Sequence, residues 1–168
     1  MQRGSELALS ARHERALRAR GAVEHGRGHF PWIVLLHVLW PPALIAEVEF
    51  AGARPGSTWP VWFALLLIAQ GLRVASIHAL GERWTTRIWV LPGVAPVRRG
   101  PYRWLRHPNY LAVALELAAA PMLFGAWRTA LLATLANAAL MAVRIPIEAR
   151  AVHGGGAGVD PAPRDPAP

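Results

Sequence analysis

His107 and Pro108 stand near the middle of the chain and are the first candidates for a chemical role. Proline suits the first position of a helix, and the residue before a proline is pushed toward extended geometry, so a helix should begin at Pro108 with the His107 ring outside it. The backbone N–H groups of Asn109, Tyr110 and Leu111 would then be unpaired, and such amides attract anions. Four nearby arginines add positive charge: Arg98, Arg99, Arg103 and Arg106. This pattern indicates an anion-attracting site, with anchoring at a membrane surface as the alternative.

A second group of residues recurs at helical spacing near the end of the chain, and it comprises Asn137, Met141, Arg144 and Glu148. Spacings of 4, 3 and 4 residues place the group on one helix face. Arg144 and Glu148 can pair, and Pro146 between them should bend the helix. A bent, charged helix end opposite an anion-attracting helix start would form a pocket open to the cytoplasm. The alternative is an interfacial arginine with a surface partner.

Polar residues also occur inside the apolar stretches. Gln70 and Arg73 are one helical turn apart, and an arginine at that depth costs a few kcal/mol unless it is paired or reaches the interface. Glu116 is a candidate partner. We interpret His37 and Glu47 as interior or interfacial polar groups instead of ligands. The histidines show no metal-ligand spacing, so no metal is expected, and the absence of cysteine excludes disulfides, thiolate metal sites and a cysteine nucleophile.

The chain contains four apolar blocks, which span residues 30–48, 59–80, 109–125 and 127–143. His107 and Pro108 directly precede the third block, and Arg144 directly follows the fourth. About 20 apolar residues are needed to cross about 30 Å of hydrocarbon as a helix. The last two blocks are separated by so short a turn that they must form an antiparallel hairpin. A soluble α-bundle is the alternative, but its helices would each show a polar stripe, and these blocks are nearly apolar all round. The sequence therefore predicts an all-α, polytopic membrane protein with about four transmembrane helices.

The distribution of arginine predicts the orientation of these helices. All 18 basic residues are arginine, and the formal net charge is +8. Six arginines precede the first block, six lie between the second and third, and three follow the fourth, whereas the other two connections hold one each. Because cytoplasmic segments are enriched in arginine, both termini and the long 81–108 loop should be cytoplasmic. We expect a multi-pass protein of a bacterial inner (plasma) membrane, with the lipid bilayer and not nucleic acid as partner.

The flanking segments differ in kind from the apolar core. Residues 1–29 read as a cytoplasmic, basic amphipathic segment with a helix near the membrane surface, and they contain no signal-peptide core. Residues 30–152 form the transmembrane domain. Residues 153–168 hold four glycines and four prolines, which predicts a disordered tail. The 81–108 loop is rich in tryptophan, valine and proline, which indicates short extended pieces and tight turns, one of them at Gly100-Pro101.

Two of these segments resemble the isoprenylcysteine carboxyl methyltransferase family, whose members are integral-membrane enzymes that use S-adenosylmethionine. The resemblance rests on GPYRWLRHPNYLAVALEL at 100–117 and RIPIEARAV at 144–152, and it includes LGERWTTRIWVLPG at 80–93. It is nearest to a bacterial branch that O-methylates alkylpyrones and related long-chain phenolic lipids. The resemblance implies a cofactor pocket formed by Val97, Gly100, Tyr102, His107, Pro108 and Tyr110. It also implies catalytic roles for Arg144 and Glu148.

The resemblance leaves the methyl acceptor open. A prenylcysteine-type carboxylate and a polyketide-derived alkylpyrone or phenolic lipid both fit, and the exclusive use of arginine favours the bacterial lipid. The family commonly has two consecutive acidic residues where this chain has Glu148 and Ala149. Two alternatives follow. One is an NADPH-dependent membrane sterol-type reductase, which shares an element like RHPNY but usually requires a longer chain. The other is a catalytically inactive membrane relative.

Overall fold

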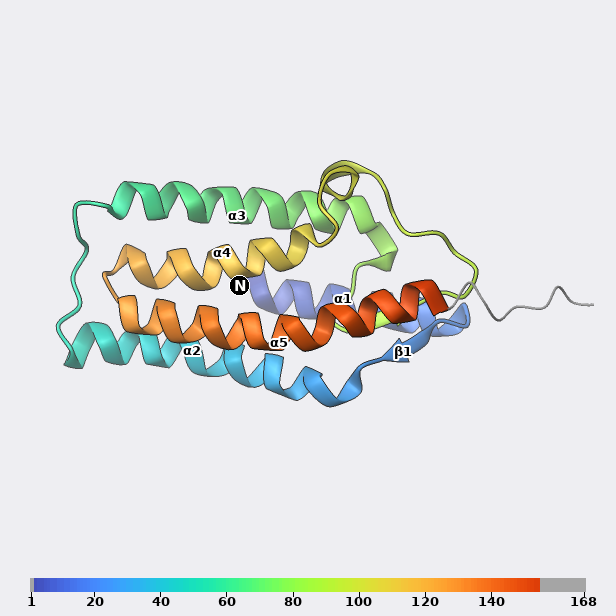
Figure 1. Ribbon diagram of the computed structural model, residues 1–168, viewed down its shortest axis with the longest axis horizontal. Coiled ribbons are helices and arrows are strands. Elements are labelled where there is room, and N and C mark those ends of the chain that lie inside the picture. Colours follow the sequence, from blue (N-terminus) through green and yellow to red (C-terminus); the bar gives the residue numbers. More distant parts are fainter. Residues whose placement is uncertain (1, 155–168) are drawn as a thin grey trace, which may run out of the picture. The chain divides into compact units, whose positions relative to one another are not determined.

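The apolar blocks form helices where the sequence predicts them. The computed structural model describes residues 2–154, and its long helices are α2 (Phe30–Phe50), α3 (Trp59–Leu80), α4 (Pro108–Leu123) and α5 (Trp127–Gly154) (Figure 1). A proline stands in the first turn of α2, α3 and α4, where its missing N–H leaves no helical hydrogen bond unmade. Only residues 124–126 separate α4 from α5, so the two helices form the expected hairpin.

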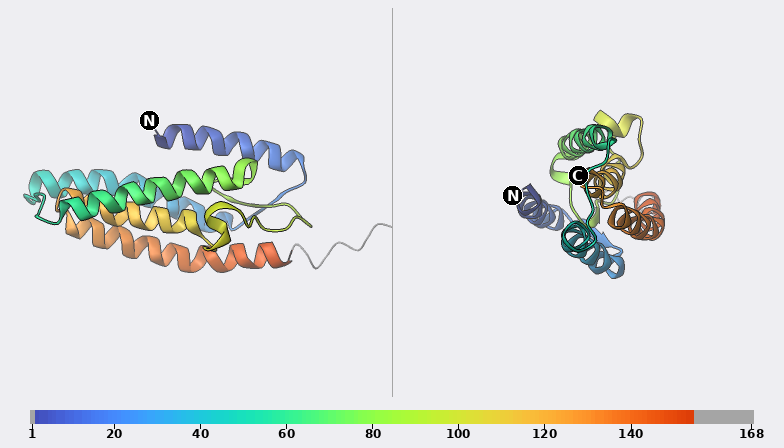
Figure 2. Two further views of the ribbon diagram at one scale, coloured as in Figure 1. Left: turned by 90° about the horizontal axis from the view of Figure 1, so that it is seen from above. Right: turned by 90° about the vertical axis from the view of Figure 1, so that its left-hand side faces the viewer.

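The chain folds as two units. The first contains residues 2–27, residues 82–96 and the part of α5 that begins at residue 145. The second contains residues 28–81 and 97–144, and therefore holds α2, α3, α4 and most of α5. In the second unit these helices run side by side (Figures 1 and 2).

A buried polar cluster joins α3 to α4 in the second unit. Arg73 donates from Nε to Glu116 Oε1 at 3.0 Å and from Nη2 to Glu116 Oε2, and Gln70 Nε2 also donates to Glu116 Oε1. All three side chains lie within the apolar stretches of their helices. The prediction that Glu116 is the partner of Arg73 is confirmed. Pairing removes most of the penalty that an isolated arginine would incur at this depth.

A second buried carboxylate joins α2 to α5. Glu47 accepts hydrogen bonds from the backbone N–H of Arg128 at 3.1 Å, from that of Thr129 at 2.7 Å and from the Thr129 hydroxyl at 2.7 Å. The first turn of a helix leaves its N–H groups without partners, so Glu47 acts as an N-terminal cap supplied by another helix. This confirms the interpretation of Glu47 as an interior polar group.

The helices of the second unit expose large apolar side chains, as a membrane-embedded surface requires. Leu39 and Ile45 on α2, and Leu132 on α5, are more than half exposed. Within residues 2–154, three segments are long and apolar enough to cross a membrane: Arg27–Phe50, Trp59–Arg83 and Trp127–Val152. Helix α4 has 16 residues and a length of about 24 Å, less than the roughly 30 Å of the hydrocarbon core. The protein is thus mostly helical with three candidate spans, and a fourth span at α4 and the orientation of the termini stay predictions.

The first unit is built on the N-terminal helix α1 (Gln2–Ala19). The sequence predicts a helix within residues 1–29, and its location at the membrane surface stays a prediction. Next to it, strands β1 (Val23–His25) and β2 (Ile88–Val90) pair antiparallel with Val23 opposite Val90. Extended pieces were predicted in the 81–108 loop, but this two-stranded sheet was not. Helix α5 ends at Gly154, and the rest of the predicted tail lies outside the described residues.

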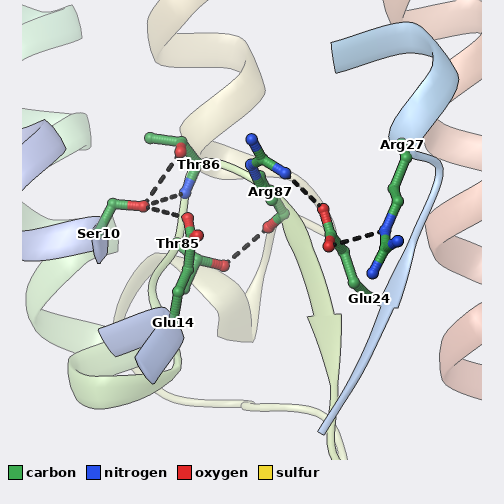
Figure 3. Close-up of polar contacts among 7 residues, drawn as sticks. All are labelled: Ser10, Glu14, Glu24, Arg27, Thr85, Thr86 and Arg87. Atoms are coloured by element: carbon green, nitrogen blue, oxygen red, sulfur yellow. Dashed lines mark hydrogen bonds and ion pairs between the residues drawn. The ribbon is translucent and has the colours of Figure 1, made fainter. Parts of the chain in front are cut away.

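Polar contacts hold the first unit together (Figure 3). Ser10 on α1 accepts the Thr86 N–H at 2.9 Å and lies 3.0 Å from the Thr86 hydroxyl. Glu24 on β1 accepts from Arg87 at 2.8 Å and from Arg27 at 2.9 Å. The first unit also has a small apolar core of Leu17, Ala22 and Leu91, with Trp89 packed against it. These contacts connect α1 to the beginning of the 81–108 loop.

Candidate functional site

The start of α4 has the geometry that the sequence predicts. Helix α4 begins at Pro108, and His107 before it adopts φ −134° and ψ 61°, outside the helical region. The backbone N–H groups of Tyr110 and Leu111 both donate to the His107 carbonyl, at 3.1 and 3.2 Å. The prediction that these two amides are unpaired is therefore wrong, because the carbonyl that precedes the helix already accepts the first bonds of the helix. The backbone of this helix start offers less attraction for an anion than expected.

The His107 and Tyr110 side chains form a stacked aromatic pair. Their ring centroids are 5.3 Å apart, and the ring planes differ by only 4°. Because the backbone of His107 is not helical, its side chain can lie against the first turn of α4 and stack on the ring of Tyr110. The pair presents a flat, preformed aromatic surface at the beginning of α4.

Arg144 on α5 completes this cluster. Its Nε donates to the Tyr110 hydroxyl at 2.8 Å, and its guanidinium carbon lies 5.3 Å from the centroid of the Tyr110 ring. The residue is 5% exposed, so a permanent positive charge is buried beside an aromatic ring. The contact joins α4 to α5 and brings together three of the predicted site residues, His107, Tyr110 and Arg144.

The predicted polar face of α5 is also present. Asn137 and Arg144 are buried, Met141 and Glu148 are half-buried, and Val143 on another face is exposed. Helix α5 continues through Pro146, and Glu148 stands four residues beyond Arg144 on its continuation, in the part that belongs to the first unit.

The remaining predicted cofactor residues lie around a short 3-10 turn, η3 (Gly100–Arg103). This turn packs on the C-terminal end of α3 (Figure 1). Arg99 donates from Nε to the Ala79 carbonyl at 2.7 Å, which caps that helix end. Gly100 has φ 55°, a conformation that favours glycine, and a Cβ there would lie 3.1 Å from Ala79 Cβ, a tight contact. Val97 and Tyr102, the other predicted residues of this segment, are half-buried.

Two residues that the sequence analysis did not select belong to the same region of the second unit. Asn109 carries a buried Oδ1 atom that has no hydrogen-bond partner among the described residues. His29, buried directly before α2, lies close enough to Arg144 for their charges to interact. Neither residue leaves a local signal in the sequence. The missing partner of the Asn109 oxygen depends on the surrounding fold, and His29 is more than a hundred positions away from Arg144.

No group of three histidine, aspartate or glutamate side chains arranged for a metal occurs within residues 2–154.

Comparison with known proteins identifies the family. Residues 62–153 match the isoprenylcysteine carboxyl methyltransferase (ICMT) family, and this range contains both the η3–α4 segment and Arg144. The chain belongs to the ICMT family. It is 40% identical to the uncharacterized protein YpbQ of Bacillus subtilis over 153 residues, which cover 91% of both chains. It is 33% identical over 147 residues to an uncharacterized protein of Haemophilus influenzae, covering 87% of this chain and 86% of the other. No solved structure matches.

Membership in the ICMT family fits the architecture. The family takes its name from a methyltransferase, which suggests a membrane methyltransferase, and three helices of this member are long and apolar enough to cross a membrane. The His107–Tyr110–Arg144 cluster joins residues from the two segments on which the resemblance rests.

Proposed function

We propose that this ICMT-family member transfers a methyl group from S-adenosylmethionine to an oxygen atom of a lipophilic acceptor at the cytoplasmic face of the membrane. The observation that carries the proposal is the His107–Tyr110–Arg144 cluster, which combines an aromatic surface with a buried guanidinium. An aromatic surface suits a flat base or a cation, and a guanidinium suits an anionic oxygen.

The residues of this region fit the cofactor. The stacked rings of His107 and Tyr110 offer a face for an adenine ring or a sulfonium group, and the unpartnered Oδ1 of Asn109 can accept a hydrogen bond from an amino or hydroxyl group. The family resemblance adds Val97, Gly100, Tyr102 and Pro108 to the residues that would hold the cofactor. When bound, S-adenosylmethionine would supply a methyl group on a positively charged sulfur, and the C–S bond would break as the acceptor oxygen forms the new C–O bond, leaving a neutral thioether.

The protein's contribution to this chemistry is orientation and removal of water. A carboxylate or the acidic enol of an alkylpyrone is already ionised near pH 7, so methyl transfer to these acceptors needs no strong base. A phenol, with a pKa of about 10, becomes ionised only at higher pH. The guanidinium of Arg144 can bind the acceptor oxygen without neutralising it. The hydrogen bond from Nε to Tyr110 fixes the plane of its guanidinium. Glu148, four residues further along α5, would orient the same guanidinium or face the sulfonium side.

The acceptor is proposed to be a membrane lipid. A polyketide-derived alkylpyrone or phenolic lipid is favoured, and a prenylcysteine-type carboxylate is the second candidate. The apolar tail of either molecule has no reason to leave the bilayer, so it should enter laterally between helices. The large apolar side chains exposed on the helices of the second unit support such a route.

The test is methyl transfer by the full-length protein in lipid nanodiscs. S-adenosylmethionine labelled in its methyl group is offered with a long-chain alkylpyrone, a phenolic lipid or a prenylated cysteine, and label should appear in one acceptor class. Across acceptors of different acidity, the pH–rate profile should follow the acceptor's pKa. A profile that shifts with enzyme variants but not with acceptor acidity would contradict the mechanism. Absence of label in all three acceptors and in extracted membrane lipids would contradict the proposed activity.

A further inference from the structure

A basic and aromatic patch is formed by residues on both sides of η3, before α4 begins, and neither the cofactor nor the acceptor accounts for it. The patch comprises Arg98, Arg103, Trp104, Leu105 and Arg106. Trp104 is 79% exposed and Leu105 is 40% exposed, and the three arginines are exposed as well. The Arg103 guanidinium carbon lies 5.9 Å from the centroid of the Trp104 ring, so charge and apolar surface are presented together.

Within residues 2–154, no ion pair balances the charge of this patch. The sequence has no acidic residue between Glu82 and Glu116. Elsewhere, Arg73 and Arg87 form ion pairs with Glu116 and Glu24. By contrast, the three arginines of the patch form no ion pair with any residue in the part of the chain that the structure describes. Three uncompensated cations beside an exposed tryptophan call for an anionic partner with an apolar part.

The contacts of the neighbouring residues locate the patch at the boundary of the membrane. Arg99 and Gly100 fix the beginning of the segment to Ala79, and Ala79 lies near the end of the candidate span Trp59–Arg83. The segment ends where α4 begins, at Pro108. The patch is therefore next to the end of a candidate span, and the ends of membrane spans are where tryptophan is enriched.

We propose that this patch binds the headgroups of anionic phospholipids. The guanidinium groups of Arg98, Arg103 and Arg106 would contact phosphate oxygens, for which arginine has matching geometry, while Trp104 and Leu105 insert among the headgroups. An anionic membrane surface attracts each nearby arginine electrostatically. This attraction should raise the affinity for anionic lipid, relative to zwitterionic lipid, about fivefold per arginine. The expected preference for anionic over zwitterionic lipid is thus on the order of a hundredfold for the three. The inference does not depend on methyl transfer.

The test compares lipid binding by the full-length protein in detergent micelles. Native mass spectrometry counts bound phosphatidylglycerol and phosphatidylcholine over a titration, and the wild type should prefer phosphatidylglycerol. The triple variant R98Q/R103Q/R106Q should lose most of that preference, and R98K/R103K/R106K should keep most of it. The matched control is R128Q. Arg128 also lies over an exposed tryptophan, 5.1 Å from the Trp127 ring centroid, but it lies at the opposite end of the bundle, in the first turn of α5. This variant should keep the preference.

Several results would overturn the inference. One is a wild type that binds both lipids equally, and another is a triple glutamine variant that keeps its preference for phosphatidylglycerol. A third is saturation of the patch by glycerol 3-phosphate, with no gain from acyl chains, because this would identify a site for a soluble anion. If the triple glutamine variant does not fold, single substitutions of Arg98, Arg103 and Arg106 by glutamine replace it. Each should reduce the preference for phosphatidylglycerol over phosphatidylcholine about fivefold, and an unchanged preference in all three would overturn the inference.

Discussion

Arg144 carries a buried positive charge, is 5% exposed, and donates from Nε to the hydroxyl group of Tyr110. The Tyr110 ring contacts both His107 and Arg144, so one side chain connects the proposed cofactor surface to the proposed acceptor group. The ring and the hydroxyl of Tyr110 should therefore have separable functions.

Tyr110→Phe tests this separation. The variant keeps the ring that stacks on His107 but loses the hydrogen bond to a charged group, which is worth about 1.5–3 kcal/mol. We expect kcat/KM for the acceptor to fall by about 10- to 100-fold, with little change in the affinity for S-adenosylhomocysteine. Tyr110→Ala should lower both kcat/KM for the acceptor and the affinity for S-adenosylhomocysteine. Steady-state kinetics and equilibrium binding provide the two readouts, and wild-type kinetics for Tyr110→Phe would show that the hydroxyl does not position Arg144.

Glu24 gives a second prediction at the residue scale. Burial alone would raise the pKa of Glu24, but hydrogen bonds and charge from Arg87 and Arg27 outweigh it and hold the pKa below its usual value of 4.5. A carboxyl whose pKa is lowered by folding stabilises the protein above its unfolded pKa, and this contribution is lost as the pH falls through the folded-state value. Glu24→Gln should therefore destabilise the first unit by about 1–2 kcal/mol at pH 7.

The measurement for Glu24 is unfolding of wild type and variant from pH 7 down to pH 3, with hydrogen exchange at β1 and β2 as the local readout. The difference between the two proteins should shrink as the pH falls below 4.5. Arg27→Gln serves as the control, because Arg27 is 74% exposed and a pair with so exposed a partner contributes less than about 1 kcal/mol. A difference between wild type and Glu24→Gln that is independent of pH would contradict the assigned role of the charge.

At the scale of elements, three polar contacts connect the four long helices in a series. Gln70 and Arg73 join α3 to α4 through Glu116, Tyr110 joins α4 to α5 through Arg144, and Glu47 joins α5 to α2 through Thr129. Polar groups in an apolar environment have few alternative partners, so each contact specifies which helices are neighbours.

Replacement of Glu116 tests the first of these contacts. Glu116→Gln leaves Arg73 without its counter-charge, and breaking a buried pair in this way costs about 3–5 kcal/mol. The double variant Arg73→Leu/Glu116→Leu removes both charges and should be closer in stability to wild type than Glu116→Gln is. Thermal unfolding in nanodiscs compares the three proteins. Equal stability of Glu116→Gln and wild type would mean that the ion pair does not hold α3 against α4.

The helices and part of the site could be predicted from sequence because their signals are local. Apolar blocks set the positions of α2 to α5, and Pro108 set the start of α4. The burial of Arg73 in an apolar block required a partner, and Glu116 offered the matching charge. By contrast, strands β1 and β2 have three residues each and are more than 60 positions apart, so neither has a periodicity to detect. The pairing of the Tyr110 and Leu111 amides with the His107 carbonyl depends on the backbone conformation at His107, which residue types alone do not reveal.

At the scale of the whole molecule, the distribution of arginine predicts which side of the membrane each connection faces. The chain has no cysteine, so single cysteines can be introduced and labelled without background. Ser57, between α2 and α3, and Ala95, in the 81–108 loop, are both exposed. In intact cells a membrane-impermeant thiol reagent should label Ser57→Cys, and it should label Ala95→Cys only after permeabilisation. Labelling of both residues from the same side would contradict the predicted topology.

The central claim is that an S-adenosyl ligand binds beside His107, Tyr110 and Arg144, and direct binding tests it without knowledge of the acceptor. Isothermal titration of the full-length protein in nanodiscs with S-adenosylhomocysteine and, separately, with NADPH is the measurement. We predict saturable binding of S-adenosylhomocysteine that Tyr110→Ala weakens, and no binding of NADPH. Binding of NADPH in place of S-adenosylhomocysteine would identify a reductase, and a folded protein that binds neither ligand would contradict the account altogether.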